Sequence, residues 1–496
     1  MNATTNTSSS FRRVALLLPL LVTLLLLNAC MVGPKYRRPS APVPQVYKEP
    51  PPAGWKEAQP KDQAIRGKWW EIYNDPQLNA LEEQVNISNQ NVLLAEAQYR
   101  EARDAVRIAR SGLFPTVSTS PSVSRSKPSS TLSPNSTLFV AGARWDYTLP
   151  VDVSYQADVW GSIRRSVRAN SALAQASAAQ LENARLSFQA ELATFYFELH
   201  GLDGDQDLLQ RTLKLYQDYL DLTQKRFNVG VASGADVAQA RTQLAVTRAQ
   251  LIDIGVQRAQ FEHAVAILTG KAPAGFSIAA SPLRTPPPVV PVGLPSDLLE
   301  RRPDIAAAER QAGSANEQIG IAKAAFYPAL LFSASGGFQT ADIAQWFNAP
   351  SRFWSVGGQL AETLFDGGKR RAQLDLTEAA YDATVANYRE TVLTAFQQVE
   401  DNLAALRVLA DEAIAEDEAV SAAEQALAIS AAQYKAGTTS YLQVITSQTA
   451  ALQAEKSAVD ILTRRMVANV LLIEALGGGW DTSKLPNEKQ VAARTK

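Results

Sequence analysis

The sequence is poor in the residues from which disulfides, metal sites and catalytic centres are built. It holds one cysteine, Cys30, so no disulfide can form within the chain, and two histidines, His200 and His263, that lie far apart without cysteine partners. These counts exclude a zinc site of ordinary ligand spacing. With only three methionines, no ladder of thioethers marks a route for copper. We therefore expect neither a metal site nor a bound cofactor.

The chain also lacks an excess of charge and a catalytic motif. Its 48 lysine and arginine residues balance 49 aspartate and glutamate residues, so no field attracts nucleic acid. Residues 230–234 come nearest to a nucleophile elbow, but Ser233 stands one position too far from Gly230 and the turn joins two helical segments. Because a nucleotide-binding loop is also missing, we expect no enzyme, and any transport would be passive.

The N-terminus indicates the compartment. Residues 1–29 have the charged, apolar and small-residue regions of a signal peptide, with an apolar run too short to span a bilayer. They end in Leu27-Asn28-Ala29-Cys30, which resembles a bacterial lipobox; diacylglycerol and an N-acyl chain would then modify Cys30. Met31 stands where an aspartate would resemble an inner-membrane retention signal, which favours the outer membrane. An ordinary cleaved signal with an incidental cysteine is the alternative.

Proline-rich stretches divide the rest of the chain. Residues 30–68 predict an extended tether rather than a packed element, and residues 282–303 predict a linker. The linker separates two halves, residues 69–281 and 304–479, which are followed by a tail at residues 480–496. Glycines, arginines and prolines recur at matching positions of the two halves, which predicts two internal repeats.

Each repeat predicts the same order of elements: a helix that ends at a proline, two strands, a long helix, a short turn and a return helix. The helices cover residues 78–114, 162–227 and 236–269 in the first repeat, and 304–327, 369–434 and 443–476 in the second. A continuous helix of about 65 residues would extend on the order of 100 Å, although Gly201 and Gly204 are predicted to break the first one. Such lengths suit a tube.

The return helix of the first repeat also predicts coiled-coil-like packing. Its apolar residues recur at steps of three, four or seven; they are Val237, Ala240, Leu244, Leu251, Ile254, Phe261, Val265 and Leu268.

The predicted strands, at about residues 116–159 and 329–365, alternate apolar and polar residues, most regularly from Trp145 to Val159. A soluble sheet with one buried face would alternate as well. The length of this run, its aromatic residues toward the ends and the acids on its polar face favour lipid outside and water inside.

Four strands per chain are too few to close a barrel, and a lipid-exposed sheet cannot leave its edges unpaired. Several chains must therefore share one barrel. Three copies would supply twelve strands, an even number within the bacterial range. Two or four copies would satisfy the same argument. The predicted fold class is mainly α with a shared β-barrel.

Several motifs give the chain a family resemblance. They are Cys30-Met31-Val32-Gly33-Pro34-Lys35-Tyr36, Trp69-Trp70, Asp75-Pro76-Gln77-Leu78, Arg302-Pro303-Asp304-Ile305 with Ala308-Glu309, Leu364-Phe365-Asp366-Gly367-Gly368, and Ala475-Leu476-Gly477-Gly478-Gly479-Trp480. With these motifs the chain resembles the outer-membrane factor family of TolC-like channels, in its lipidated OprM-type (NodT) branch. The resemblance implies a homotrimer in outer-membrane lipid, a twelve-stranded barrel continued by a periplasmic helical tunnel, a periplasmic adaptor and an inner-membrane transporter of the resistance-nodulation-division (RND) type.

The resemblance also implies functional positions at the far ends of the helix pairs. The turns there match adaptor-docking sites, and we take Gly230, Ser233, Gly437 and Ser440 as candidates. Plain turn chemistry is the alternative, because glycine and serine serve any tight helix reversal. Tyr434 and Leu442 match positions of the periplasmic gate. Thr446 replaces an aspartate of relatives, so the gate must be held differently, for example through Asp236 or Leu442.

Together these features predict the outer-membrane channel of a tripartite RND-type efflux pump, a passive exit duct for drugs and other toxic small molecules. The lipobox and the Arg302-Pro303-Asp304 segment favour this function over a duct for type I protein secretion. Efflux of metal ions is a further alternative, and a structural periplasmic lipoprotein is the alternative without a channel.

Overall fold

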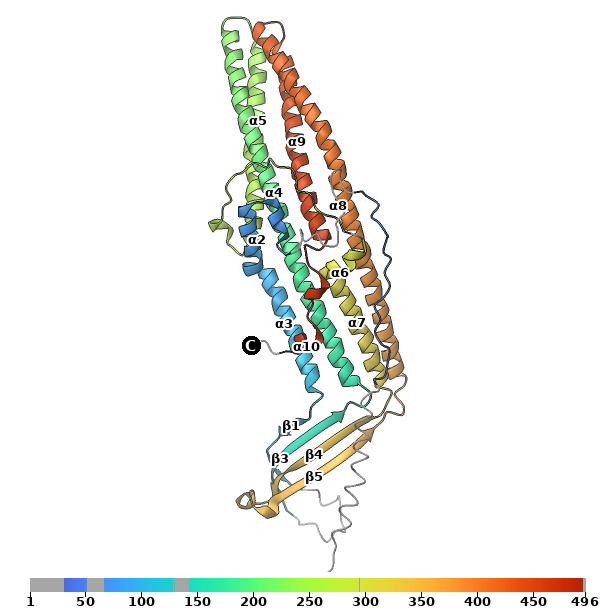
Figure 1. The fold of residues 1–496 in the computed structure, drawn as a ribbon. Helices are drawn as coiled ribbons and strands as arrows, with labels where there is room; N and C mark the ends of the chain where they lie inside the picture. Colours follow the sequence, from blue (N-terminus) through green and yellow to red (C-terminus); the bar gives the residue numbers. More distant parts are fainter. Residues whose placement is uncertain (1–30, 51–66, 128, 130–141, 294, 494–496) are drawn as a thin grey trace, which may run out of the picture.

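The computed structural model describes residues 31–50, 67–127, 129, 142–293 and 295–493. Figure 1 shows an elongated body of helices that carries an antiparallel sheet at one end. The predicted signal peptide and the lipidation candidate Cys30 lie outside the described residues. In the described part of the chain, none of the helices combines the length and the hydropathy needed to cross a bilayer.

Two helical hairpins form the length of the body (Figure 1). The first consists of α4 (Ser162–Asn228) and α5 (Gly234–Leu268), and the second of α8 (Lys369–Ala436) and α9 (Tyr441–Ala475). At 67 and 68 residues, α4 and α8 each extend on the order of 100 Å. Both hairpin turns lie at the end of the body opposite the sheet.

The predicted break of the first long helix at Gly201 and Gly204 is wrong, because α4 continues through both glycines. A Cβ atom on Gly201 would collide with the side chain of Thr463 on α9, and one on Gly204 would lie 3.2 Å from Val459 Cγ1. The glycines therefore let α4 and α9 approach closely. A glycine costs a helix only about 1 kcal/mol, which tertiary packing outweighs.

Shorter helices pack against the long ones in the half of the body nearer the sheet. They are α2 (Pro76–Ser88), α3 (Gln90–Ser111), α6 (Leu298–Arg301), α7 (Pro303–Ala324) and α10 (Glu488–Ala492). Single turns of 3₁₀ helix lie at Trp69–Tyr73 (η2), Pro273–Gly275 (η3), Pro295–Asp297 (η4), Ile343–Gln345 (η5), Ala349–Ser351 (η6) and Thr482–Lys484 (η7).

The helix predicted at residues 78–114 is divided in two at Asn89. The Asn89 side chain accepts hydrogen bonds from the N–H groups of Asn91 and Val92, and donates one to the carbonyl of Leu268 at 2.9 Å. This residue therefore caps α3 while it ties the break to the end of α5.

The hydrophobic core lies in the widest part of the body, where α2, α4, α6, α7, α8 and α9 meet. Trp69, Leu192, Tyr388 and Leu472 are among its fully buried side chains. A smaller cluster near the hairpin turns consists of Tyr219, Ala240, Tyr434, Tyr441 and Val444. The body thus has an interior of its own.

The N-terminal segment, predicted as an extended tether rather than a packed element, is extended but packs against the body over residues 31–50. Residues 31–50 form neither helix nor strand, but they lie against the helical body. The hydroxyl of Tyr36 donates to Glu309 Oε1 of α7 at 2.7 Å, and Glu49 pairs with Arg407 of α8 at 2.7 Å. Proline keeps this segment extended, and side-chain contacts from residues far apart in the sequence dock it.

The sheet consists of β1 (Thr116–Thr119), β2 (Ser122–Ser126), β3 (Arg144–Ala157), β4 (Ala329–Thr340) and β5 (Arg352–Ala361). Both β1 and β2 pair with β3, which pairs with β4, which in turn pairs with β5; all pairs are antiparallel. The first predicted strand is thus two short strands interrupted at Ser120 and Pro121. Proline has no N–H group for the ladder, which explains the interruption.

Candidate functional site

The register of the sheet gathers apolar side chains from every strand on one face. Val153 of β3 lies opposite Ala334 of β4, which lies opposite Val356 of β5. We call this surface the apolar face. It comprises Val117, Val123, Trp145, Tyr147, Leu149, Val151, Val153, Tyr155, Leu330, Phe332, Ala334, Phe338, Trp354, Val356 and Leu360.

The opposite face of the sheet is mostly polar. It carries Thr116, Ser118, Ser122, Ser124, Asp146, Thr148, Asp152, Ser154, Gln156, Ser333, Ser335, Gln339, Ser355 and Gln359. The amide of Gln339 donates to Asp146 Oδ1 at 3.0 Å, so polar groups of adjacent strands bond across this face. Pro150, Leu331 and Phe353 are apolar exceptions on this face, and Arg125 and Arg352 are charged exceptions on the apolar face. The alternation predicted from the sequence is thereby confirmed in space.

The apolar face lies open. On β5, Trp354 is 81%, Val356 75% and Leu360 69% exposed. A soluble sheet would cover such a face with a second layer, yet Figure 1 shows the helices continuing from one end of the sheet rather than packing across it. An exposed apolar surface of this kind marks contact with a membrane or another protein.

Aromatic side chains lie at both ends of the sheet. At the end away from the helices, the rings of Trp145 and Tyr147 stack 5.9 Å apart, and Trp346 lies 5.6 Å from Tyr147. At the junction with the helices, Trp160 stacks on Tyr327 at 4.7 Å and donates to the carbonyl of Pro328 at 2.8 Å. Two aromatic bands that flank an apolar one are the pattern of a strand region that crosses an outer membrane.

Both edges of the sheet are unpaired within the described chain. The edge strands are β1 and β2 on one side and β5 on the other, and each has a strand neighbour on one side only. Their outer N–H and C=O groups are therefore available to further strands.

The first hairpin turn is closed by a capping box. Gly230 adopts the left-handed region at φ 76°, and the Ser233 hydroxyl accepts from the Asp236 N–H at 3.1 Å. The Asp236 carboxylate in turn accepts from the Ser233 N–H at 2.9 Å. Val229 and Val231 project from this turn with exposed fractions of 73% and 64%.

The second hairpin turn has the same outline and different chemistry. Gly437 adopts φ 81°, and the N–H of Thr438 donates to the carbonyl of Gln433 at 3.0 Å. Ser440 precedes α9 without a side-chain capping bond. The turn exposes Thr438 where the first turn exposes valines. The four docking candidates therefore lie on two adjacent but unequal tips.

A contact that sequence reasoning missed joins the two hairpins beneath these tips. Arg226 of α4 donates to the main-chain carbonyl of Tyr434 on α8, and its guanidinium carbon lies 4.6 Å from the centre of the Tyr434 ring. The Tyr434 hydroxyl lies 3.1 Å from Thr223 Oγ1, and its ring lies 5.3 Å from that of Tyr441. Two basic residues in the last turn of α4 were the available signal, but their partner on the other repeat was not visible in the sequence.

The gate candidates do not share one cluster within a single chain. Tyr434 is buried with Tyr441, where burial raises the pKa of the Tyr441 hydroxyl and keeps it protonated. Leu442 and Thr446 are exposed on α9, and the Thr446 hydroxyl donates to the Leu442 carbonyl at 3.0 Å. Asp236 is engaged in the cap of α5.

Residues 31–493, apart from the segments that the structure does not describe, contain no group of three or more His, Cys, Asp or Glu placed to hold a metal ion.

An elongated helical body that ends in an antiparallel sheet with an uncovered apolar face is the architecture of an outer-membrane channel protein. The comparisons with known proteins agree, because the model of the outer membrane efflux protein family matches residues 81–271 and 294–478. The chain belongs to this family, which confirms the resemblance found from the motifs.

Individual relatives cover almost the whole chain. The probable efflux pump outer membrane protein TtgC of Pseudomonas putida is 30% identical over 470 residues, which are 94% of this chain and 96% of TtgC. Outer membrane protein OprJ of Pseudomonas aeruginosa is 31% identical over 468 residues, with coverages of 94% and 96%. A solved structure of the outer-membrane channel OprN superimposes with a TM-score of 0.83 at 29% identity, covering 91% of this chain and 100% of that one.

Proposed function

We propose that this protein is the outer-membrane channel of a tripartite efflux pump, a passive duct through which small toxic molecules leave the cell. The observation that carries the proposal is the uncovered apolar face of the sheet, backed by a polar face and continued by long helices. TtgC and its relatives are named efflux pump outer membrane proteins, some of them for toluene, other solvents or antibiotics. Substrates of this kind are part of the proposal.

The open edges support a barrel that several copies share. The chain contributes four strand positions, and lipid tolerates no unpaired edge, so β5 of one copy must pair with the β1 and β2 edge of the next. Three copies would make a barrel of twelve strands. A homotrimer is favoured over two or four copies by the resemblance to the TolC-like channels.

The long helices support a tunnel that extends the barrel into the periplasm. Three copies of the two hairpins would surround an aqueous path, and the tips at the far end would meet the periplasmic adaptor of an RND-type inner-membrane transporter. The exposed Val229 and Val231 of the first tip offer an apolar contact, and Gly230, Ser233, Gly437 and Ser440 shape the two turns. Leu442 and Thr446, exposed on α9 close to the tips, are the proposed gate surface, with Tyr434 and Asp236 supporting it from within the hairpins.

The docked N-terminal segment supports lipidation of Cys30. The N–H of Val32 donates to the carbonyl of Trp160 at 3.1 Å, which fixes the start of the described chain at the junction of sheet and helices. An acyl chain on Cys30 would enter the membrane at that level.

Reconstitution tests the channel directly. The purified full-length protein should require detergent, migrate as a heat-modifiable trimer and conduct ions in planar bilayers. Deletion of its gene should raise susceptibility across a panel of drugs and solvents, and the protein should retain a periplasmic adaptor in pull-downs. A soluble monomer with folded helices and no conductance would contradict the proposal. Retention of a secreted polypeptide with unchanged susceptibility would favour the protein-secretion duct.

A further inference from the structure

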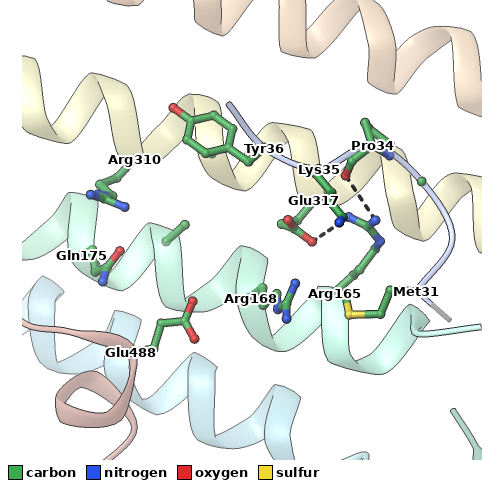
Figure 2. Close-up of a pocket in the computed structure, with 13 residues that line it drawn as sticks. Met31, Pro34, Lys35, Tyr36, Arg165, Arg168, Gln175, Arg310, Glu317 and Glu488 are labelled. Atoms are coloured by element: carbon green, nitrogen blue, oxygen red, sulfur yellow. Dashed lines mark hydrogen bonds and ion pairs between the residues drawn. The ribbon is translucent and has the colours of Figure 1, made fainter. Parts of the chain in front are cut away.

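A cavity of about 550 Å³ lined by several charged side chains lies where the helical body meets the sheet. It is open to solvent on one side and is bounded by α4, α7, the docked N-terminal segment and the start of α10 (Figure 2). Four cationic side chains line it: Lys35, Arg165, Arg168 and Arg310. Two carboxylates, Glu317 and Glu488, also line it, so the lining has an excess of positive charge.

Arg165 forms a fixed wall of this cavity. The residue is 3% exposed, its Nη1 donates to Glu317 Oε2 at 2.8 Å, and its Nη2 donates to the carbonyl of Pro34 at 3.2 Å (Figure 2). Gly33 and Gly320 flank the guanidinium, and a Cβ atom on Gly320 would collide with it. The buried Nε of Arg165 has no hydrogen-bond partner among the described residues. The two glycines thus leave space for the buried guanidinium, and the carboxylate of Glu317 neutralises its charge.

The remaining cations of the cavity are less well matched. Arg310 pairs with Glu309 at 3.1 Å. Within the described part of the chain, Arg168 and Lys35 have neither an ion pair nor a side-chain hydrogen bond, and both are exposed at the mouth of the cavity. Glu488 is drawn beside Arg168 in Figure 2, and its negative charge would repel an anionic ligand bound there. A buried guanidinium wall with two available cations suits an anion with several oxygens.

The position of the cavity narrows the choice of anion. Arg165 and Arg168 lie in the first two turns of α4, about 10 Å or less from its start beside the sheet. Met31 also lines the cavity, directly after the proposed lipidation site. The stacked Trp160 and Tyr327 lie at the same junction, where an interfacial aromatic band is expected. Phospholipid headgroups of the inner leaflet would lie at this level.

We propose that this cavity binds the phosphate of an anionic phospholipid headgroup. Arg168 and Lys35 bind the phosphate oxygens, and Arg165 holds the N-terminal segment and α7 in place as the wall. Basic pockets beside membrane-spanning elements are known to take anionic headgroups in this way. The inference rests on the proposed insertion of the sheet into the outer membrane. Its consequence is that the docked N-terminal segment and a bound lipid together fix the height of the protein in the bilayer.

Native mass spectrometry of the full-length protein released from detergent provides the test. Phosphatidylglycerol should be retained in preference to phosphatidylcholine. The double variant Lys35→Gln and Arg168→Gln should lower this retention about tenfold or more, because each removed group is a charged hydrogen-bond donor. Glu488→Gln should raise it, because the opposing carboxylate is removed. Lys214→Gln with Arg248→Gln removes two exposed charges from the hairpins, far from the sheet, and should leave retention unchanged.

Several outcomes would overturn the proposal. Equal retention of the two lipids, or equal loss in the control pair, would show that the cavity does not select an anionic headgroup. Competition by inorganic phosphate alone at low millimolar concentration would identify a site for soluble anions instead. Planar-bilayer conductance of the same preparations separates this result from a failure of the proposed function, because a protein that conducts but shows no lipid preference overturns only the lipid site.

Discussion

The helical body and the sheet of this protein differ in the burial of their apolar side chains. The body buries Trp69, Leu192 and Leu472 in a core of its own, whereas the sheet leaves Trp354 and Val356 open. The body can therefore fold by burial within one chain, but the sheet depends on surroundings that the chain does not contain. The surface of the body therefore suits water, whereas the apolar face of the sheet suits lipid. The boundary between the two environments lies at the junction that Trp160 and Tyr327 mark.

A charge placed on the apolar face should have the largest effect on assembly, because it disrupts the sheet while it leaves the body intact. Val356→Arg places a guanidinium where lipid is expected, which costs about 2–4 kcal/mol per chain near the middle of the membrane. We expect loss of the heat-modifiable trimer and of conductance, while the helical circular dichroism of the body persists. Ser355→Arg, one residue away on the polar face, is the matched control and should still assemble. Equal behaviour of the two variants would show that the faces are not in different solvents.

An added methyl group within the body should give the next largest effect. Gly201→Ala forces a Cβ atom into the side chain of Thr463, and overpacking of this kind costs about 1–3 kcal/mol. Gly255→Ala in α5 is the control, because no atom lies within 4 Å of its added Cβ and the helix should gain about 0.5–1 kcal/mol. Thermal unfolding followed by circular dichroism should therefore shift in opposite directions. A shift of the same sign in both variants would contradict the close packing of α4 and α9.

The two tips predict a smaller difference within the body. Ser233→Ala removes the hydroxyl that accepts from the Asp236 N–H, which costs about 1 kcal/mol, while the main-chain N–H of residue 233 can still donate to the Asp236 carboxylate. Ser440→Ala removes no side-chain capping bond and should cost less. Hydrogen exchange at the first turn of α5 should accelerate in the first variant, with little change at α9 in the second. Equal acceleration at both tips would refute the asymmetry.

The smallest expected effect concerns Glu82, a carboxyl group buried in the core of the body. Burial raises the pKa of Glu82 well above its usual value, and neither oxygen has a partner among the described residues. The folded state therefore binds this proton more tightly than the unfolded state, and stability falls as the pH rises above about 4 toward the folded-state pKa.

Glu82→Gln should consequently raise the melting temperature at pH 7, by on the order of 1 °C. The gain should vanish near pH 4, where the carboxyl is protonated in both states. Glu96→Gln, which removes the charge of an exposed carboxylate on α3, should give no such gain. A gain from Glu82→Gln that is independent of pH would exclude the buried acid as its cause.

Local sequence signals predicted the helices and strands, but not the tertiary contacts between them. Alternation located β3 and β4 because a strand repeats every two residues, and Pro115 and Pro328 marked where α3 and α7 must stop because the backbone restriction of proline acts locally. Gly201 was misread because its role depends on Thr463, far away in the sequence. The docking of Tyr36 on Glu309 and of Arg226 on Tyr434 was missed for the same reason. Secondary-structure propensity reflects interactions between residues close together in the sequence. Gly201, Tyr36 and Arg226 instead contact residues that are far away in the sequence.

The unbroken course of α4 and α8 has a mechanical consequence. A rod on the order of 100 Å long turns a tilt of one degree at the sheet into a displacement of about 2 Å at its far end. Arg226 ties the two rods together at that end, so they would swing as one lever. In the proposed trimer, rotations too slight to strain the strands would then suffice to change the distance between the tips of neighbouring copies.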